Sequence, residues 1–247
     1  MNFFSLFKRK LIYKFKKKYS IDDDNCENKS LDNLFELYGS DKANFFSITK
    51  SKGHGYSQYY HNHLKELQNK RINILEVGSY AGSSAAAFTK YFPNAEVFCL
   101  DVNISNFKYT SKRINVFGLD IKDDKKLTKI FQEIFLEKKF KNFDLIIDDG
   151  SHNLNDILIG LKFLFDYLKD KGVYVIEDFK FPNYYAYNRN VDDILIDRLL
   201  KNLKEKKFFN SSILNKNDQL NLINSIKKID IYKGNLKESD ICFIKKN

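Results

Sequence analysis

The 247-residue sequence lacks tryptophan and has only three cysteines, two prolines and ten glycines. Cys26, Cys99 and Cys242 form no C-x-x-C pair and no Cys/His spacing typical of zinc sites or disulfide frameworks. A reduced, intracellular protein is therefore expected, and we predict a cytoplasmic location. The scarcity of proline and glycine leaves no obvious flexible linker. The length is accordingly interpreted as one large domain with an extension.

Long apolar runs are missing as well. No segment approaches the roughly 20 apolar residues of a membrane span, and the first eighteen residues have no core of signal-peptide length. Residues 1–18 mix apolar side chains with Lys and Arg, so a helix there would be basic and amphipathic. Two interpretations stay open: peripheral contact with an anionic inner membrane face, or a terminal helix without a membrane role.

The positive charge is almost entirely lysine. The formal net charge is +10, and 37 of the 42 basic residues are Lys. Nucleic-acid grooves tend to use Arg for bidentate contacts to phosphates and bases. The excess of Lys over Arg therefore argues against a nucleic-acid partner. The net positive charge still allows attraction to anionic ligands or surfaces.

From Arg71 onward, short apolar runs bounded by turn residues alternate with segments of helical period, which predicts β-α-β units and a parallel sheet. The five predicted strands are Ile72–Gly78, Ala95–Asp101, Ile114–Asp120, Phe143–Asp149 and Gly172–Asp178. The predicted helices are Ser83–Phe92, Asp123–Lys138, Asn155–Lys169 and Val191–Lys206. A terminal hairpin follows, formed by residues 227–234 and 240–246.

The expected fold class is α/β: a Rossmann-like, doubly wound sheet of seven strands, five parallel plus a C-terminal hairpin with one antiparallel strand. This is the element order of the class I methyltransferase sheet. Residues 31–68 show no strand signal and are predicted to form a helical cap over the C-terminal edge of the sheet. The predicted organisation is a basic extension at 1–30, the cap at 31–68 and the sheet domain at 69–247.

A glycine turn follows the first strand in the segment EVGSYAGSS. Gly78 and Gly82 lie four apart before a helix that begins at Ser83, where exposed backbone amides favour polar or anionic groups. The spacing E-x-G-x-x-x-G differs from the dinucleotide fingerprint G-x-G-x-x-G. It resembles the first motif of S-adenosylmethionine-dependent methyltransferases.

That resemblance implies a set of cofactor contacts. Glu76 would lie near the amino group of the methionine moiety, and Gly78 would let the cofactor pass over the backbone. Asp101, at the end of the second strand, can accept hydrogen bonds from both ribose hydroxyls. Asp120, at the end of the third, would lie beside adenine. The alternative for each acid alone is a solvated residue at a strand end.

Four acids end two strands that the fold makes neighbours: Asp148, Asp149, Glu177 and Asp178. Hard oxygen ligands of this kind suit Mg²⁺ or a similar divalent cation. Some of the acids could instead cap a helix or pair with Lys. We favour Asp149 as a metal ligand, whereas Asp148 is expected to face the cofactor or support the site. His152 follows three residues after Asp149 and can take a proton from a substrate hydroxyl near neutral pH.

Several motifs together resemble the metal-dependent sugar O-methyltransferases typified by the mycinamicin and demethylmacrocin enzymes of macrolide biosynthesis. They are YGSDK (38–42), HGYSQYY (54–60), ILEVGSYAGSS (74–84), FPNAEVFCLD (92–101), DLIIDDGSH (144–152) and GVYVIEDF (172–179). The resemblance implies that Asp149, Glu177 and Asp178 hold the metal and that His152 is the general base. Tyr56, with His54 nearby, would face the cofactor or the substrate.

The resemblance thus implies an O-methyltransferase that uses S-adenosylmethionine and Mg²⁺. The expected acceptor is a sugar hydroxyl in a glycan, a glycolipid or a nucleotide-sugar precursor, because the chain lacks the long N-terminal region of the macrolide enzymes. Two alternatives stay open: an acceptor with catechol-like or other small-molecule hydroxyls, and a non-catalytic binding protein that kept the fold. Oligomerisation stays open too.

Overall fold

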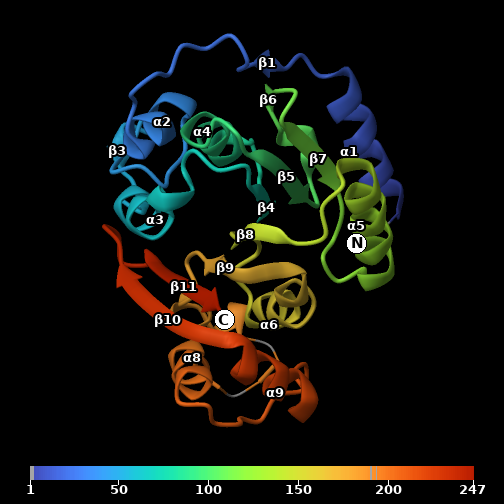
Figure 1. Cartoon of the computed structure of the whole chain (residues 1–247), viewed down its shortest axis with the longest axis vertical. Coiled ribbons are helices and arrows are strands. Elements are labelled where there is room, and N and C mark those ends of the chain that lie inside the picture. Colours follow the sequence, from blue (N-terminus) through green and yellow to red (C-terminus); the bar gives the residue numbers. More distant parts are fainter. Residues whose placement is uncertain (1–2, 190, 193) are drawn as a thin grey trace. The chain divides into compact units, whose positions relative to one another are not determined.

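The computed structural model describes residues 3–189, 191–192 and 194–247 (Figure 1). The chain divides into two compact units. Unit 1 consists of Met1–Asp120 with Gly234–Ser239, and unit 2 of Ile121–Lys233 with Asp240–Asn247. The division into an extension, a cap and a sheet domain stays a prediction.

A seven-stranded sheet has the order β10-β11-β9-β8-β4-β5-β7. In unit 1 three strands pair in parallel: β4 (Asn73–Val77), β5 (Glu96–Asp101) and β7 (Ile114–Gly118). In unit 2, β8 (Phe143–Asp148) and β9 (Leu168–Ile176) are parallel, whereas β11 (Asp240–Lys246) is antiparallel to β9 and to β10 (Ile226–Lys233). The predicted α/β fold, with five parallel strands and a terminal hairpin, is confirmed.

The central strands owe their form to uninterrupted apolar runs. In β8, Leu145, Ile146 and Ile147 are all fully buried, so both faces of this strand are covered. Such runs are typical of parallel strands that have helices on both faces. In β10, by contrast, only Ile226 and Ile229 are buried, which fits an edge strand with one face in solvent.

The helices of unit 1 are α1 (Phe3–Phe15), α2 (Leu31–Tyr38), α3 (Ser57–Leu64) and α4 (Ser83–Tyr91) (Figure 1). Aromatic side chains pack α2, α3 and α4 together: the Phe88 ring lies 5.3 Å from Phe35 and 5.2 Å from Tyr60, measured between centroids. Short 3-10 turns occur at Lys65–Leu67 and Ile104–Asn106.

The absence of strands from residues 31–68 is a wrong prediction. Phe45–Phe46 (β2) and Ser51–Lys52 (β3) pair as a small antiparallel ribbon. Two-residue strands give no periodicity that a sequence pattern could detect. A second such pair, also not predicted, joins β1 (Tyr19–Ser20) to β6 (Tyr109–Thr110) in parallel.

The helices of unit 2 are α5 (Asp124–Lys138), α6 (Leu154–Phe163), α7 (Phe181–Tyr184), α8 (Ile196–Lys204) and α9 (Lys216–Ser225). The predicted helix Asn155–Lys169 is too long, because α6 ends at Phe163, a 3-10 turn follows at Phe165–Tyr167 and β9 begins at Leu168.

The other predicted helix, Val191–Lys206, begins only at Ile196, and its residue 193 lies outside the described residues. A 3-10 turn at Ala186–Asn188 precedes it. Helix α9 was not predicted, although Asn215 and Asp218 form a capping box at its start. Among the described residues, no helix combines the length and apolarity needed to cross a bilayer.

Candidate active site

In unit 1, the turn between β4 and α4 has a backbone conformation that requires glycine. Gly78 and Gly82 have φ angles of +83° and +77°, in the left-handed region that side chains disfavour. A Cβ on Gly82 would lie 2.4 Å from the Phe107 ring. The turn therefore requires glycine at Gly82 for both conformation and space.

Asp101 holds this turn in place. One carboxylate oxygen accepts a hydrogen bond from the Tyr80 amide at 2.7 Å, and the other accepts one from the Asn103 amide at 2.5 Å. Each carboxylate oxygen can accept more than one hydrogen bond. Asp101 therefore orders the turn and keeps acceptor capacity for hydroxyl groups.

The remaining predicted cofactor residues of unit 1 differ in burial. Glu76 is fully buried and accepts a hydrogen bond from the Ser84 hydroxyl on the first turn of α4. Ser83 is 9% exposed, and Asp120 is half-buried two residues after β7. Their assignment to a cofactor stays a prediction.

Tyr56 and His54 lie at the start of α3. Tyr56 is fully buried, and its ring centroid lies 5.2 Å from that of His54. The His54 Nδ1 atom is 2.8 Å from the buried Ser239 hydroxyl, and its Nε2 atom is 3.8 Å from Asp41. These contacts fix the two side chains within unit 1, so the sequence motif HGY has a packing role whatever else it contacts.

In unit 2, three predicted site residues gather at the ends of β8 and β9. Asp149, His152 and Asp178 each offer one ligand atom, and these atoms all lie within 4.8 Å of one another. The His152 Nε2 atom is 3.8 Å from Asp149 Oδ1. Asp178 is 7% exposed, whereas Asp149 and His152 are half-buried and open in part to solvent. Below, we call these three residues the acid–histidine cluster.

Two cluster residues have a strained backbone. His152 and Asp178 have φ angles of +55° and +48°, which are uncommon for residues other than glycine. Ser151 closes the loop before α6 by donating to Asp156 at 2.6 Å, and the Asn188 amide donates to the His152 carbonyl at 3.2 Å. The loop is therefore held in the conformation that presents the imidazole.

Two further predicted residues flank the cluster. Glu177 is 2% exposed, and its backbone amide donates to the Asp148 carbonyl at 3.0 Å. Burial raises the pKa of Asp148 to about 6, against lowering contributions from His152, the Tyr174 hydroxyl and the Gly150 amide. The Tyr174 hydroxyl donates to Asp148 Oδ2 at 3.3 Å. Both of these oxygens lie next to Gly160, so the Asp148 carboxyl faces α6.

The space for the Asp148–Tyr174 contact comes from Gly160 on α6, where an added Cβ would lie 2.7 Å from both side-chain oxygens. Gly160→Ala is expected to lower the free energy of unfolding by about 1–3 kcal/mol through overpacking, although alanine normally stabilises a helix. Urea unfolding followed by circular dichroism measures the change in the free energy of unfolding. The loss should shrink in a Tyr174→Phe background; equal losses in both backgrounds would contradict the steric explanation.

Sequence reasoning missed Gly160, Tyr174 and Asn188. Tyr174 and Gly160 lie within a strand and a helix that read as ordinary apolar segments. The aromatic-rich stretch FPNYYAYN (181–188) directly after the fifth parallel strand was a visible signal for Asn188.

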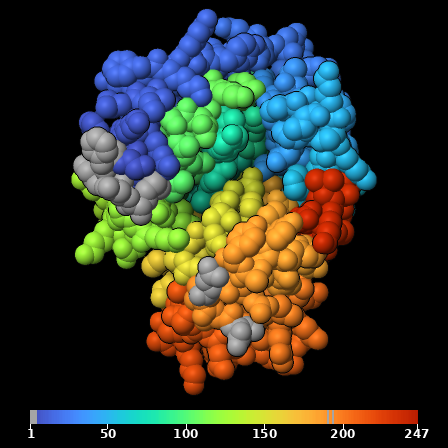
Figure 2. Space-filling model, turned by 180° about the vertical axis from the view of Figure 1, so that it is seen from behind, coloured from blue at the N-terminus to red at the C-terminus, as the bar shows by residue number. Residues whose placement is uncertain are grey.

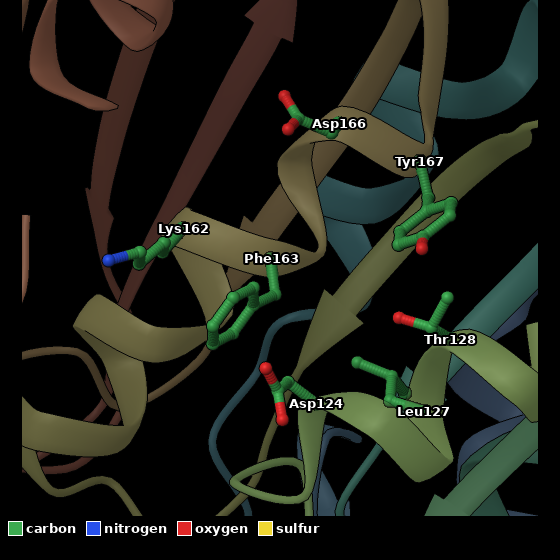
Figure 3. A pocket seen from close by; sticks show the side chains of 7 residues that line it. All are labelled: Asp124, Leu127, Thr128, Lys162, Phe163, Asp166 and Tyr167. Atoms are coloured by element: carbon green, nitrogen blue, oxygen red, sulfur yellow. The ribbon is translucent and has the colours of Figure 1, made fainter. Parts of the chain in front are cut away.

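A pocket of about 130 Å³ lies between α5 and α6 (Figure 3). Its lining residues are Asp124, Leu127, Thr128, Lys162, Phe163, Asp166 and Tyr167. Lys162 already pairs with Asp218 at 3.2 Å and donates to the Ile213 carbonyl. None of the predicted site residues lines this pocket, and we assign it no role.

Comparison with solved structures identifies the class of fold. MycE methyltransferase from the mycinamycin biosynthetic pathway, in complex with Mg, SAH and mycinamycin VI, superimposes with a TM-score of 0.68 at 21% identity. The match covers 90% of this chain and 55% of that one. The chain therefore has the Rossmann-like fold of a methyltransferase.

Curated proteins with similar sequences indicate a more specific resemblance, to O-methyltransferases that act on sugars. The mycinamicin VI 2''-O-methyltransferase of Micromonospora griseorubida is 26% identical over 132 residues, 51% of this chain and 31% of that enzyme. The L-olivosyl-oleandolide 3-O-methyltransferase of Streptomyces antibioticus is 30% identical over 159 residues, 62% of this chain and 38% of that enzyme. The predicted resemblance to mycinamicin-type sugar O-methyltransferases is confirmed. The aligned segment amounts to about a third of the length of these curated relatives. No family model matches the chain.

Proposed function

We propose that the protein is an O-methyltransferase that uses S-adenosylmethionine and Mg²⁺ to methylate a sugar hydroxyl of a glycan, a glycolipid or a nucleotide-sugar precursor. The acid–histidine cluster is the observation that carries this proposal. It combines a hard-cation ligand set with a group able to accept a proton, which is the combination that methylation of an alcohol needs. The named activities of the two relatives support the same reaction type.

The donor set of the cluster fits a hard divalent cation. Asp149 and Asp178 supply carboxylate oxygens, the hard ligands that Mg²⁺ prefers in proteins. Asp149, Asp178 and the neighbouring Glu177 would hold the ion. An ion held there would supply positive charge that makes the proton of an acceptor hydroxyl easier to remove.

His152 is the proposed general base. Its imidazole lies at the partly exposed end of the cluster, with Nε2 3.8 Å from Asp149 Oδ1. In this role Nε2 takes the proton of the acceptor hydroxyl, and the nearby carboxylates stabilise the imidazolium that forms. The Asn188 contact to the His152 carbonyl holds the backbone that carries the imidazole.

Unit 1 is the proposed binding site of S-adenosylmethionine, whose sulfonium supplies the methyl group. The Gly78–Gly82 turn gives a ligand close access to the backbone, and the first amides of α4 favour a polar group. Asp101 would bind the ribose hydroxyls, and Asp120 would lie beside adenine. Glu76 and Tyr56 would contact the methionine end. In unit 2, Asp148 would support the acid–histidine cluster.

Labelled S-adenosylmethionine and a panel of acceptors test the proposal. The panel contains nucleotide sugars, oligosaccharides and catechol. We expect label in the sugar fractions alone, and only with Mg²⁺ present. Transfer to catechol in preference to every sugar would contradict the acceptor class, and no binding of S-adenosylmethionine by calorimetry would contradict the enzyme assignment.

We also propose that α1 contacts an anionic membrane surface. Arg9 donates to the Val102 carbonyl, Lys16 donates to two carbonyls of the Ile104–Asn106 turn, and the Tyr13 ring contacts Phe107 edge-on, so one face of α1 packs within unit 1. Three apolar side chains four residues apart stay exposed on the other face: Phe7 at 53%, Leu11 at 41% and Phe15 at 79%. The dark-blue N-terminal segment lies at the surface in Figure 2.

Exposed lysines flank this apolar ridge, among them Lys8, Lys10 and Lys14. Such a surface suits an anionic bilayer, because the apolar side chains enter the interface while the lysines attract the headgroups. The double variant Phe7→Ser/Phe15→Ser should reduce sedimentation with phosphatidylglycerol vesicles at least tenfold. The matched control is Leu136→Ser on α5, which removes an 84% exposed side chain. Equal binding to phosphatidylcholine vesicles would refute the requirement for an anionic surface, and unchanged binding by the double variant would refute the contact through α1.

A further inference from the structure

An uninterrupted row of aromatic rings begins at the acid–histidine cluster. The Phe181 ring centroid lies 4.9 Å from that of His152 and 5.2 Å from that of Tyr185, and Tyr185 lies 5.6 Å from Tyr187. Phe181 and Tyr185 are half-buried, whereas Tyr187 is 68% exposed. We call Phe181, Tyr185 and Tyr187 the ring strip. It leads from the candidate base into solvent.

The segment that carries the ring strip is fixed at three points. The Asn183 side chain accepts a hydrogen bond from the first amide of α8 at 3.2 Å, and the Tyr184 hydroxyl donates to Asp240 at 2.9 Å. Asn188 holds the far end by donating to the carbonyls of His152 and Ser151. A binding surface fixed before the ligand arrives loses less conformational entropy on binding.

Asn188 connects the ring strip to the cluster at an energetic cost. The residue as a whole is only 5% exposed, and its Oδ1 atom has no hydrogen-bond partner among the residues that the structure describes. The two carbonyls that accept from Nδ2 fix the orientation of the amide, so rotating it would not satisfy Oδ1. Buried unsatisfied acceptors are rare. We interpret Asn188 as a positioning residue that keeps the strip in register with His152.

We propose that the ring strip is the acceptor subsite and that it binds a carbohydrate chain, with pyranose rings stacked on Tyr185 and Tyr187; this rests on the proposed function. A pyranose presents C–H groups on its faces and hydroxyls at its edge, and the electron-rich face of an aromatic ring attracts such C–H groups. A row of rings beside the base can therefore hold several sugar residues while one hydroxyl reaches His152.

The exposure of the strip favours a chain over a small planar diol. Sites for small molecules are concave and bury most of the ligand, whereas the outer ring of this strip, Tyr187, is 68% exposed and lies on an open surface. An open aromatic surface of this kind fits a ligand that continues beyond the reacting residue. Of the acceptor classes in the proposed function, it therefore favours a glycan or glycolipid.

Binding measurements test the subsite. The full chain with Mg²⁺ and S-adenosylhomocysteine is titrated with methyl pyranosides, gluco-hexasaccharides and catechol, using saturation-transfer NMR and calorimetry. We expect at least one saccharide to bind, Tyr187→Ala to raise its Kd about tenfold, and Tyr187→Phe to change it less than about twofold. The control variant Phe208→Ala removes another exposed ring of unit 2 and should leave the Kd unchanged.

Three results would overturn the subsite: no saccharide binds, the Kd of Tyr187→Ala equals that of the wild type, or catechol alone binds in a Tyr187-dependent way. Methyl transfer to a sugar at unchanged KM in Tyr187→Ala would refute the subsite and leave the proposed function intact. Tyr187-dependent saccharide binding without any methyl transfer would refute the proposed function and leave the subsite intact.

Discussion

Replacing His152 by asparagine is expected to lower kcat by roughly 10²–10⁴-fold, the usual contribution of a general base. Asparagine suits this position because it tolerates the φ of +55° that His152 adopts and cannot accept the hydroxyl proton. The affinities for S-adenosylmethionine and Mg²⁺ should change less than about threefold. Steady-state kinetics and calorimetry on the same preparation separate these effects.

The matched control is His61→Gln, which alters a histidine that contacts the Tyr91 hydroxyl at 2.7 Å in unit 1. This variant should keep its kcat. If His152→Asn loses Mg²⁺ affinity in parallel with activity, the imidazole is a metal ligand, as its membership of the three-residue cluster also permits. Undiminished activity in His152→Asn would remove it from the mechanism.

Replacing Asp178 by asparagine is expected to reduce activity on the order of 10³-fold, because a catalytic metal ion contributes several kcal/mol to transition-state stabilisation. The substitution conserves shape, and asparagine tolerates the φ of +48° at this residue. Mg²⁺ should raise the melting temperature of the wild type and leave that of the variant unchanged, since only a protein that binds an ion in its folded state is stabilised by it.

Asp144 provides the control for this second substitution. It lies on β8, the strand that pairs with β9, which Asp178 follows, and its carboxylate pairs with the 59% exposed Lys169 at 3.0 Å. A surface pair of this kind contributes at most about 1 kcal/mol. Asp144→Asn should therefore keep both the Mg²⁺-dependent shift and the activity. A wild type whose melting temperature does not respond to Mg²⁺ would contradict the metal site itself.

The sequence predicted the parts of the fold that repeat a strong pattern. Leu145, Ile146 and Ile147 form a buried run followed by acids, and such runs identify parallel strands whatever surrounds them. Helix ends were less predictable. The helical periodicity of α6 continues past Phe163, but tertiary pairing of Leu168 with Phe143 makes that residue a strand. The ribbon β2–β3 is too short for any pattern.

The candidate site was predictable where the order of the strands alone determines which residues lie close together. Asp149 and Asp178 closely follow the ends of the adjacent parallel strands β8 and β9, so their proximity follows from the fold. The ring strip was not predictable, because its geometry depends on the path of residues 181–189 after the strand. Asn188 connects to His152 across 36 residues of sequence. No local pattern encodes such a contact.

Heteronuclear NMR of the product made from ¹³C-methyl S-adenosylmethionine tests the central claim most directly. The purified chain is incubated with the saccharide that it binds best, first with Mg²⁺, then with excess chelator, then with Mg²⁺ restored. We predict a new methoxy signal correlated to a ring carbon of the sugar, lost with chelator and regained with Mg²⁺. A methoxy signal of equal intensity in chelator, or a labelled methyl on any atom other than a sugar oxygen, would contradict the proposed function.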